Sequence, residues 1–320
     1  MLVRFWGTRG SLPVAPTADT IRRKIVHALL EADGRRFENA EEADRFVGTE
    51  LGFAAGSTYG GSTPCVELEA GDGSYFICDM GSGLRSFGLD SMKRNAAGHR
   101  KTYNFFLSHL HWDHIMGFPF FTPAFDPGAT IRIHAAHPDA EEALRRQQEE
   151  ISFPVPFDWL KARIEFVQLT PGETHVVDGV TVETKLQNHS HRSFGYRFTD
   201  GDGRSAIYST DSEHKLEDMS AEAAFIEFFR NADLVIVDTM YSLADSVSMK
   251  EDWGHSSNLV AVDLCHEAQA ATLALFHHEP TFADEDIQRM HEESIRYEEL
   301  TREGPPLEVI CAYDGLEVRV

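Results

Sequence analysis

The chain has 320 residues, 42% hydrophobic and 25% charged, so it is long enough and apolar enough to bury a substantial core. Its formal net charge of −23 opposes binding of a long nucleic acid, because such binding draws most of its affinity from Lys and Arg contacts with phosphates. No run reaches the roughly 20 apolar residues of a membrane span, and residues 1–5 continue into a strand pattern rather than a secretory leader. We therefore expect a soluble, enzyme-sized protein of the cytoplasm with no membrane partner.

Alternating or continuous apolar segments predict strands, and apolar residues that recur at intervals of three and four predict helices. The predicted strands are 2–6, 64–70, 74–79, 103–107, 130–134, 164–168, 174–186, 193–199, 204–209, 233–238, 271–276, 307–311 and 316–320. The predicted helices are 19–32, 39–47, 139–151, 220–230, 256–268 and 284–302. This pattern alone gives a mixed α/β fold.

The four cysteines are far apart in the sequence, and three of them lie in apolar strand or helix patterns. They are Cys65, Cys78, Cys265 and Cys311. Such placement favours buried free thiols over disulfides or a zinc ribbon, which agrees with a reducing compartment.

Four potential metal ligands occur within six residues, directly after the predicted strand 103–107. They are His109, His111, Asp113 and His114. Because side chains alternate along an extended segment, His109 and His111 can point to one side, while a turn at Trp112 would carry Asp113 and His114 toward a second point. The spacing therefore predicts a loop that binds two metal ions. The alternative is a chance cluster on a polar loop, which would suit a lone histidine better than this spacing.

Three later strand-like segments each end in a residue of ligand type. These residues are His189, Asp211 and His277. Imidazole and carboxylate groups suit zinc, manganese or iron, and a two-metal site takes further histidines and a bridging carboxylate from elsewhere in the chain. Each residue alone could be an ordinary turn or cap residue, but their common placement favours a role as ligands. Since these candidates extend from His109 to His277, we expect residues 1–320 to form one domain.

The pattern His-x-His-x-Asp-His followed by a distal His, Asp and His resembles the metallo-β-lactamase superfamily over nearly the whole chain. Further segments resemble the ribonuclease Z-like and phosphodiesterase branch of that superfamily. They are Phe5–Pro13, the strand and glycine turn Phe76–Gly83, His189–Phe198 with its Gly-Tyr pair, and Trp253–Ser257 followed by a helix and His277.

Carried over residue by residue, the resemblance implies a complete dinuclear site. One metal would be held by His109, His111 and His189, the other by Asp113, His114 and His277, with Asp211 as the bridge. Asp79 would orient a metal-bound imidazole from beneath, although an aspartate before Gly81 is also an ordinary turn residue. His278 stands beside His277 and would face the opposite side, and only the family register favours His277.

Two divalent ions a few ångströms apart lower the pKa of a bridging water to roughly 7 and can stabilise charge on a phosphoryl group. Asp113, besides being a ligand, and His255 are the candidate catalytic residues. His255, at the start of a predicted helix, could donate to a phosphate oxygen or protonate the leaving alkoxide, or could simply neighbour a helix cap. Ser256 is the expected cap.

The resemblance implies a four-layer αββα sandwich with the active site at one edge. Residues 16–58 depart from it, because a compact relative needs only a short connection there, whereas this chain has two predicted helices. This helical insertion could be a lid over the site, a dimer element that makes the protein a homodimer, or a packing element.

We expect a metal-dependent hydrolase with two divalent ions, zinc first and manganese or iron as alternatives. The expected activity is a phosphodiesterase that uses a metal-bridging hydroxide on a small or cyclic nucleotide-like phosphodiester, because the acidic chain disfavours a long nucleic acid. Two alternatives remain: hydrolysis of carboxyl esters, lactones or lactams by the same hydroxide, and a non-catalytic metal-binding interaction protein.

Overall fold

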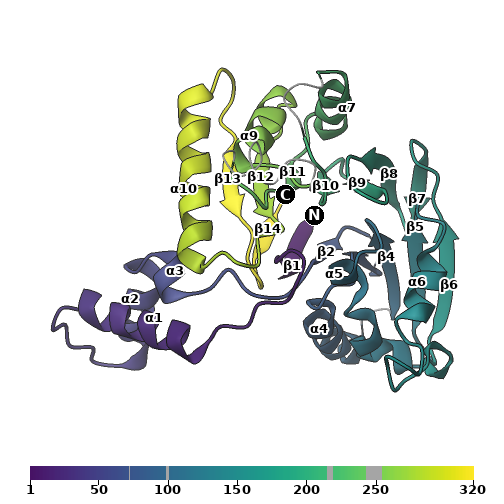
Figure 1. Cartoon of the computed structure of the whole chain (residues 1–320), viewed down its shortest axis with the longest axis horizontal. Coiled ribbons are helices and arrows are strands. Elements are labelled where there is room, and N and C mark those ends of the chain that lie inside the picture. The colour runs from purple at the N-terminus through teal and green to yellow at the C-terminus, as the bar shows by residue number, and fades with distance from the viewer. Residues whose placement is uncertain (72, 99–100, 215–218, 243–253) are drawn as a thin grey trace.

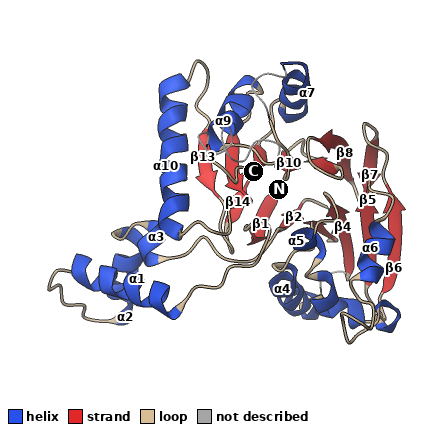
Figure 2. Cartoon of the chain, viewed as in Figure 1, coloured by secondary structure: helices blue, strands red, loops and turns tan. Residues whose placement is uncertain are grey.

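The structure is a computed structural model that describes residues 1–71, 73–98, 101–214, 219–242 and 254–320. Two mixed sheets pack face to face, and helices cover both outer faces (Figure 1, Figure 2). The predicted αββα sandwich is therefore confirmed.

The first sheet has seven strands. In spatial order they are β14 (Glu317–Arg319), β1 (Leu2–Gly7), β2 (Cys65–Glu69), β3 (Tyr75–Cys78), β4 (Thr102–Leu107), β5 (Thr130–Ala135) and β6 (Arg163–Gln168). From β3 to β6 the strands are parallel. On its outer side lie α4 (Leu84–Ala96), α5 (Trp112–Ile115), α6 (Ala140–Arg146) and the 3₁₀ turns Phe118–Phe120, Thr122–Phe125 and Phe157–Trp159.

The second sheet also has seven strands. Their order is β13 (Glu308–Cys311), β12 (Thr272–Phe276), β11 (Leu234–Asp238), β10 (Ser205–Ser209), β9 (Ser193–Thr199), β8 (Val180–Gln187) and β7 (Thr174–Val177). From β10 to β13 the strands are parallel, and β8 runs in the same direction as β10 because both are antiparallel to β9. Its outer face carries α7 (Met219–Phe229), α9 (Asn258–Glu267) and α10 (Asp284–Thr301).

Aromatic side chains fill the space between the sheets. Phe106 of the first sheet meets Phe198 and Tyr196 of the second edge-to-face, with ring centroids 4.9 and 5.6 Å apart. Such offset contacts are favourable for aromatic pairs and fix how the two sheets face each other. Two further apolar clusters separate each sheet from its helices, so the four layers enclose three cores.

Several predicted elements differ from the observed ones. The predicted strand 174–186 is two strands, since Asp178 and Gly179 form a tight turn with positive φ (44° and 85°). The helix predicted over 139–151 ends at Arg146, and α4 was not predicted at all. The prediction of four buried free cysteines is confirmed. Trp253 of the quoted motif lies outside the described residues.

The predicted cap of α9 is wrong by one residue. The hydroxyl of Ser257 accepts the hydrogen bond from the backbone N–H of Val260, which makes Ser257 the N-cap. Ser256 instead joins two other segments, because its hydroxyl donates to the Ser212 carbonyl and accepts from the His214 N–H.

The insertion contains α1 (Ala18–Glu31), α2 (Ala40–Thr49) and α3 (Phe53–Gly56), and α1 and α2 extend away from both sheets (Figure 1). Its anchor to the sandwich is α3, which packs on α10. Lys24 of α1 reinforces this anchor with hydrogen bonds to the carbonyls of Ala54 and Ser57 and an ion pair of 2.6 Å to Asp284.

The apolar side chains of α1 point away from the described part of the protein. The half-buried row on its inner side is Thr20, Lys24 and Ala28. The exposed apolar residues are Ile21, Ile25, Val26, Leu29 and Leu30, at 46–72% exposure. An ordinary surface helix turns its apolar side chains toward the core, whereas α1 exposes them. No helix of the described ranges has the length and apolarity needed to cross a membrane.

Candidate metal centre

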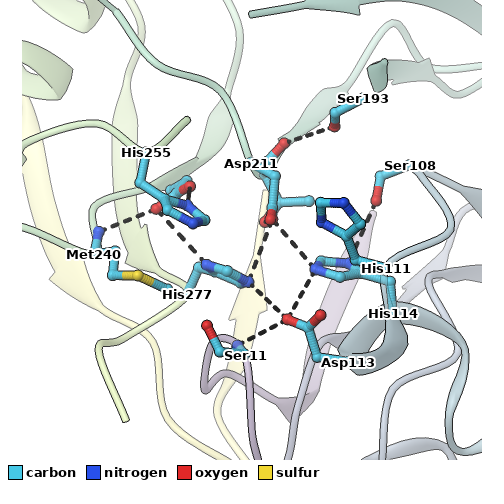
Figure 3. Close-up of polar contacts among 12 residues, drawn as sticks. Ser11, Ser108, His111, Asp113, His114, Ser193, Asp211, Met240, His255 and His277 are labelled. Atoms are coloured by element: carbon cyan, nitrogen blue, oxygen red, sulfur yellow. Dashed lines mark hydrogen bonds and ion pairs between the residues drawn. The ribbon is translucent and has the colours of Figure 1, made fainter. Parts of the chain in front are cut away.

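The predicted ligands meet where several strands end at one edge of the sandwich. β4, β8, β10 and β12 run in directions that bring their carboxyl ends to this edge, and the segments that follow them carry the ligand-type residues. After β4 the chain stays extended at His111 (ψ 155°) and then turns into the one-turn helix α5, which carries Asp113 and His114. The structure thus brings all seven sequence-predicted residues together. Figure 3 shows five of them, namely His111, Asp113, His114, Asp211 and His277.

The first group of potential ligands consists of His109, His111, His189 and Asp211. Their nearest nitrogen and oxygen atoms all lie within 4.8 Å of one another. Nε2 of His109 and Nε2 of His189 lie 3.5 and 3.8 Å from Oδ2 of Asp211, and Nε2 of His189 lies 3.2 Å from Nδ1 of His111. Burial lowers the pKa of His111 to about 4, so its imidazole is neutral and able to accept a cation near pH 7.

The second group consists of Asp113, His114 and His277. Nε2 of His114 and Nε2 of His277 lie 3.2 and 3.3 Å from Oδ2 of Asp113. Both nitrogens also lie 3.3 Å from Oδ1 of Asp211 (Figure 3). Asp211 therefore presents one carboxylate oxygen to each group, which is the arrangement that a carboxylate shared by two cations requires.

Three buried nitrogen atoms of the cluster lack hydrogen-bond partners among the described residues. They are Nε2 of His109, Nε2 of His114 and Nδ1 of His277, and the two Nε2 atoms face Asp211. A buried polar atom without a partner is costly, and a bound cation is one of the explanations for it. Since the site offers only imidazole and carboxylate donors, the residues fit zinc, manganese or iron.

The charges of the cluster are set by burial and by its own members. Burial keeps the pKa of His109 well below its usual range. Burial acts to raise the pKa of Asp113 and Asp211, but the neighbouring imidazoles outweigh it and both pKa values fall well below normal. For His114, burial acts to lower the pKa, and Asp113 and Asp211 outweigh it and raise the pKa well above 6.5. Without a metal the cluster thus holds a proton on His114.

Asp79 lies beneath the cluster and accepts hydrogen bonds from four donors. They are the backbone N–H and hydroxyl of Ser108 (2.8 and 2.7 Å), Nδ1 of His114 (2.7 Å) and the hydroxyl of Tyr208 (2.7 Å). Asp79 is fully buried and has a positive φ of 60°, an uncommon conformation outside glycine that is frequent at functional sites. The carboxylate fixes the imidazole of His114 with Nε2 toward Asp113 and Asp211.

Other backbone and side-chain groups orient the remaining imidazoles. Nδ1 of His189 lies 2.9 Å from the carbonyl of Gly254, and a Cβ at Gly254 would lie 2.2 Å from the same nitrogen. Gly254 also has a positive φ of 83°, so glycine is required both by conformation and by this close approach. Nδ1 of His109 lies 3.0 Å from the hydroxyl of Ser108.

The choice between His277 and His278 follows from their directions. His277 has a positive φ of 62° and turns its imidazole toward Asp113 and Asp211. His278 faces the other way, where its Nε2 lies 2.7 Å from the carbonyl of Ala312, and burial lowers its pKa to about 3. The geometry therefore places His277, and not His278, among the ligand-type atoms.

His255 lies beside the cluster and is paired with Asp238. Its Nδ1 is 2.6 Å from Oδ2 of Asp238, and its ring lies 5.4 Å from that of His189 and 5.2 Å from that of His277. Burial acts to lower the pKa of His255, but Asp238 outweighs it and raises the pKa to about 9. His255 and Asp238 also fall into a third group of potential ligands with Asp211 and His277. Because the short hydrogen bond already joins Nδ1 of His255 to Oδ2 of Asp238, the two residues are better suited to hold a proton between them than to bind a metal ion.

Sequence reasoning missed three residues of the site. Asp238 ends β11 just as Asp211 follows β10, so the strand-end rule that selected Asp211 could have found it. The hydroxyl of Tyr208 reaches Asp79 across the two sheets, and no local signal indicates that pairing. The backbone N–H of Ser11 donates to Oδ2 of Asp113 at 2.8 Å, a contact that brings the opening loop to the cluster.

Two mixed sheets between helical layers, with a histidine and aspartate cluster at their shared edge, define a protein of the metallo-hydrolase αββα class. Residues 86–278 match the model of the beta-lactamase superfamily domain, and the chain belongs to this superfamily. The predicted resemblance to its ribonuclease Z-like and phosphodiesterase branch is confirmed, and so is the expectation of a hydrolase of this fold.

Known proteins resemble the chain along most of its length. Ribonuclease Z of Haloarcula marismortui is 24% identical in a comparison that covers 78% of this chain and 88% of that protein. The crystal structure of a diphosphatase from the PhnP family is 20% identical with a TM-score of 0.62 and covers 100% of this chain and 97% of its own. Zn²⁺-bound PqqB from Methylobacterium extorquens is 12% identical with a TM-score of 0.65 and covers both chains completely. The two structures establish the fold.

Proposed function

We propose that the protein is a dinuclear metal-dependent phosphodiesterase that acts on a small or cyclic nucleotide-like phosphodiester. The observation that carries this proposal is Asp211, whose two carboxylate oxygens face two separate groups of ligand-type atoms. In this proposal the first cation is held by His109, His111 and His189, the second by Asp113, His114 and His277, and both by Asp211. Since these residues come from both sheets, residues 1–320 would act as one domain.

Two divalent ions bound at these residues would supply an activated water molecule and neutralise the oxygens of a phosphoryl group. Zinc is the first choice because five of the seven donors are imidazoles, and manganese or iron would fit the same donors. A zinc-bound structure of this fold is consistent with that choice.

The residues around the cations would position the reacting groups and move one proton. His255 is paired with Asp238, which raises the pKa of the imidazole to about 9 in the metal-free protein, and in this proposal it donates a proton to the leaving alkoxide. Asp238 holds the imidazole through Nδ1, which leaves Nε2 for the substrate. Asp113, whose carboxylate accepts a hydrogen bond from the N–H of Ser11, would hold the second cation at a fixed position relative to the first.

The size of the substrate is argued from charge. Relatives of this chain include ribonuclease Z, but this chain carries 52 acidic and 29 basic residues, and that excess repels a polyanion of many phosphates. A single phosphodiester is attracted by the cations themselves and needs no basic surface. We therefore favour the small substrate over an RNA.

We propose that residues 16–58 are a peripheral packing element and not a lid. The hydrogen bonds of this segment to distant residues reach Asp284 and Gln288 of α10, and none in the described ranges reaches a proposed ligand. Light scattering of the full chain would show whether the outward face of α1 also joins two copies.

The test is an assay of zinc- or manganese-loaded protein on bis(p-nitrophenyl) phosphate, a panel of cyclic nucleotides, a precursor tRNA, and p-nitrophenyl acetate with a lactone. We expect metal-dependent turnover of at least one small phosphodiester and its loss in Asp211→Asn, whereas Asp44→Asn on exposed α2 keeps full activity. Faster cleavage of the RNA would refute the small-substrate assignment, and turnover of acyl substrates alone would refute the phosphodiesterase. Binding of two metal ions without any turnover would favour the interaction protein.

A further inference from the structure

The turn between His189 and β9 holds two consecutive residues in the left-handed backbone region. They are His191, with φ 60°, and Arg192, with φ 67°. Residues with a Cβ seldom adopt this conformation, and glycine adopts it readily. Among the described residues they are the only two consecutive non-glycine residues in this region, and strained backbone of this kind is concentrated at functional sites.

The turn is held firmly at both ends. Gln187 of β8 pairs with Ser193 of β9 in the sheet register, and their side chains form a hydrogen bond of 3.1 Å. The N–H of Phe194 donates to the carbonyl of Ser108 at 2.9 Å, which ties the start of β9 to the residue before His109. These contacts fix the backbone of the turn, and with it the Cα positions of His191 and Arg192, relative to the loop that carries His109.

That place is beside the candidate metal centre. The ring of His191 lies 6.0 Å from the ring of His111, at an angle of 68°. His191 and Arg192 are both exposed, and within the described residues neither side chain forms a hydrogen bond or an ion pair. The imidazole of His191 is thus available to a ligand that approaches the first group of donors, and Arg192 adjoins it in the turn.

We propose that His191 and Arg192 form an anion-binding turn that contacts a second phosphoryl group of the substrate, next to the scissile one. A guanidinium offers several N–H donors in a planar fork that matches phosphate oxygens, and an imidazole adds one more donor. In the proposed function the residues of the two donor groups would hold the cations that take up the scissile phosphoryl group, and His191 with the adjoining Arg192 would contact charge beyond it. The substrate class is then a phosphodiester with two adjacent phosphoryl groups, such as an ester of a nucleoside diphosphate. This inference rests on the proposed phosphodiesterase activity.

The test uses Arg192→Gly and His191→Gly, because glycine suits the positive φ and these variants should fold at least as well as the wild type. Two p-nitrophenyl substrates are compared, one with a single phosphoryl group and one an ester of a nucleoside diphosphate. For Arg192→Gly we expect KM for the two-phosphoryl substrate to rise about ten-fold, the loss of one hydrogen bond to a charged group. The kcat, and KM for the one-phosphoryl substrate, should change less than about two-fold, since the cations and His255 are untouched. Arg192→Lys should recover part of the loss.

A binding measurement supplies a second readout. Metal-loaded wild-type protein should bind inorganic pyrophosphate about ten-fold more tightly than Arg192→Gly does, by titration calorimetry. The matched control is Gln269→Gly, which replaces an exposed residue of similar φ (56°) at the end of α9 and should change neither constant. Equal pyrophosphate binding, or equal KM values for both substrates, in Arg192→Gly and wild type would overturn the inference while leaving the phosphodiesterase intact. Absence of any phosphodiester turnover in the wild type would instead refute the proposed function.

Discussion

Replacing Tyr208 by phenylalanine tests whether the contact across the two sheets tunes the metal centre. The substitution removes one hydroxyl, which donates to Oδ2 of Asp79 at 2.7 Å, and keeps the ring that packs on Phe276. Asp79 is fully buried and loses one of its four donors. A hydrogen bond to a charged group contributes about 1.5–3 kcal/mol. Because Asp79 orients His114, the same energy range corresponds to roughly a ten- to hundred-fold loss of metal affinity.

The affinity is measured by competition for Zn²⁺ with a chromophoric chelator, and the stability of the metal-free protein by urea unfolding. Tyr103→Phe is the matched control: Tyr103 is equally buried, but its hydroxyl accepts from Asn95 at 2.7 Å, on the far side of the first sheet. We expect this control to lose about 0.5–1.5 kcal/mol of stability and no metal affinity. If Tyr208→Phe bound Zn²⁺ as tightly as wild type, Asp79 would not orient His114 through this network.

Three further predictions concern the same site. Gly254→Ala places a Cβ 2.2 Å from Nδ1 of His189, so we expect loss of one of two bound metal ions by elemental analysis; full occupancy would contradict the packing requirement. Zinc affinity should rise with pH through the neutral range, because His114, whose pKa is raised well above 6.5 by Asp113 and Asp211, must release its proton to bind a cation; a flat profile would contradict the assignment. In metal-free protein the pKa of His255 is raised from 6.5 to about 9, so its stabilising effect is complete below pH 6.5 and disappears as pH rises through 9. The difference in unfolding free energy between wild type and His255→Gln should therefore shrink over that range by up to about 3 kcal/mol, and a constant difference would argue against the Asp238 pair.

The potential ligands could be predicted because all of them follow the ends of strands, and strand ends can be recognised in the sequence. His109 and His111 stand on one short loop, and residues after parallel strands meet at a common edge, so His189, Asp211 and His277 could be gathered without knowledge of side-chain positions. Tyr208 could not be paired with Asp79 in this way, since the contact depends on how the two sheets face each other.

The missed elements have local physical reasons. α4 lacks a clean apolar stripe, because Gly88 and Ser91 lie on its buried face, where a Cβ at Gly88 would already approach the ring of Phe121 to 3.0 Å. Small residues that allow close packing look like breaks in a hydrophobic pattern. The split of 174–186 had a signal, the Asp-Gly pair at 178–179, which the continuous alternation on either side concealed.

The outward stripe of α1 bears on how the protein behaves at high concentration. Its five exposed apolar residues favour contact with any apolar surface, while the net charge of −23 pushes copies of the chain apart. Added salt screens the repulsion and leaves the apolar attraction intact. Clustering of the molecules should therefore increase with ionic strength, the opposite of what an interface built from ion pairs would do, and dilute, low-salt buffer is where the chain stays dispersed.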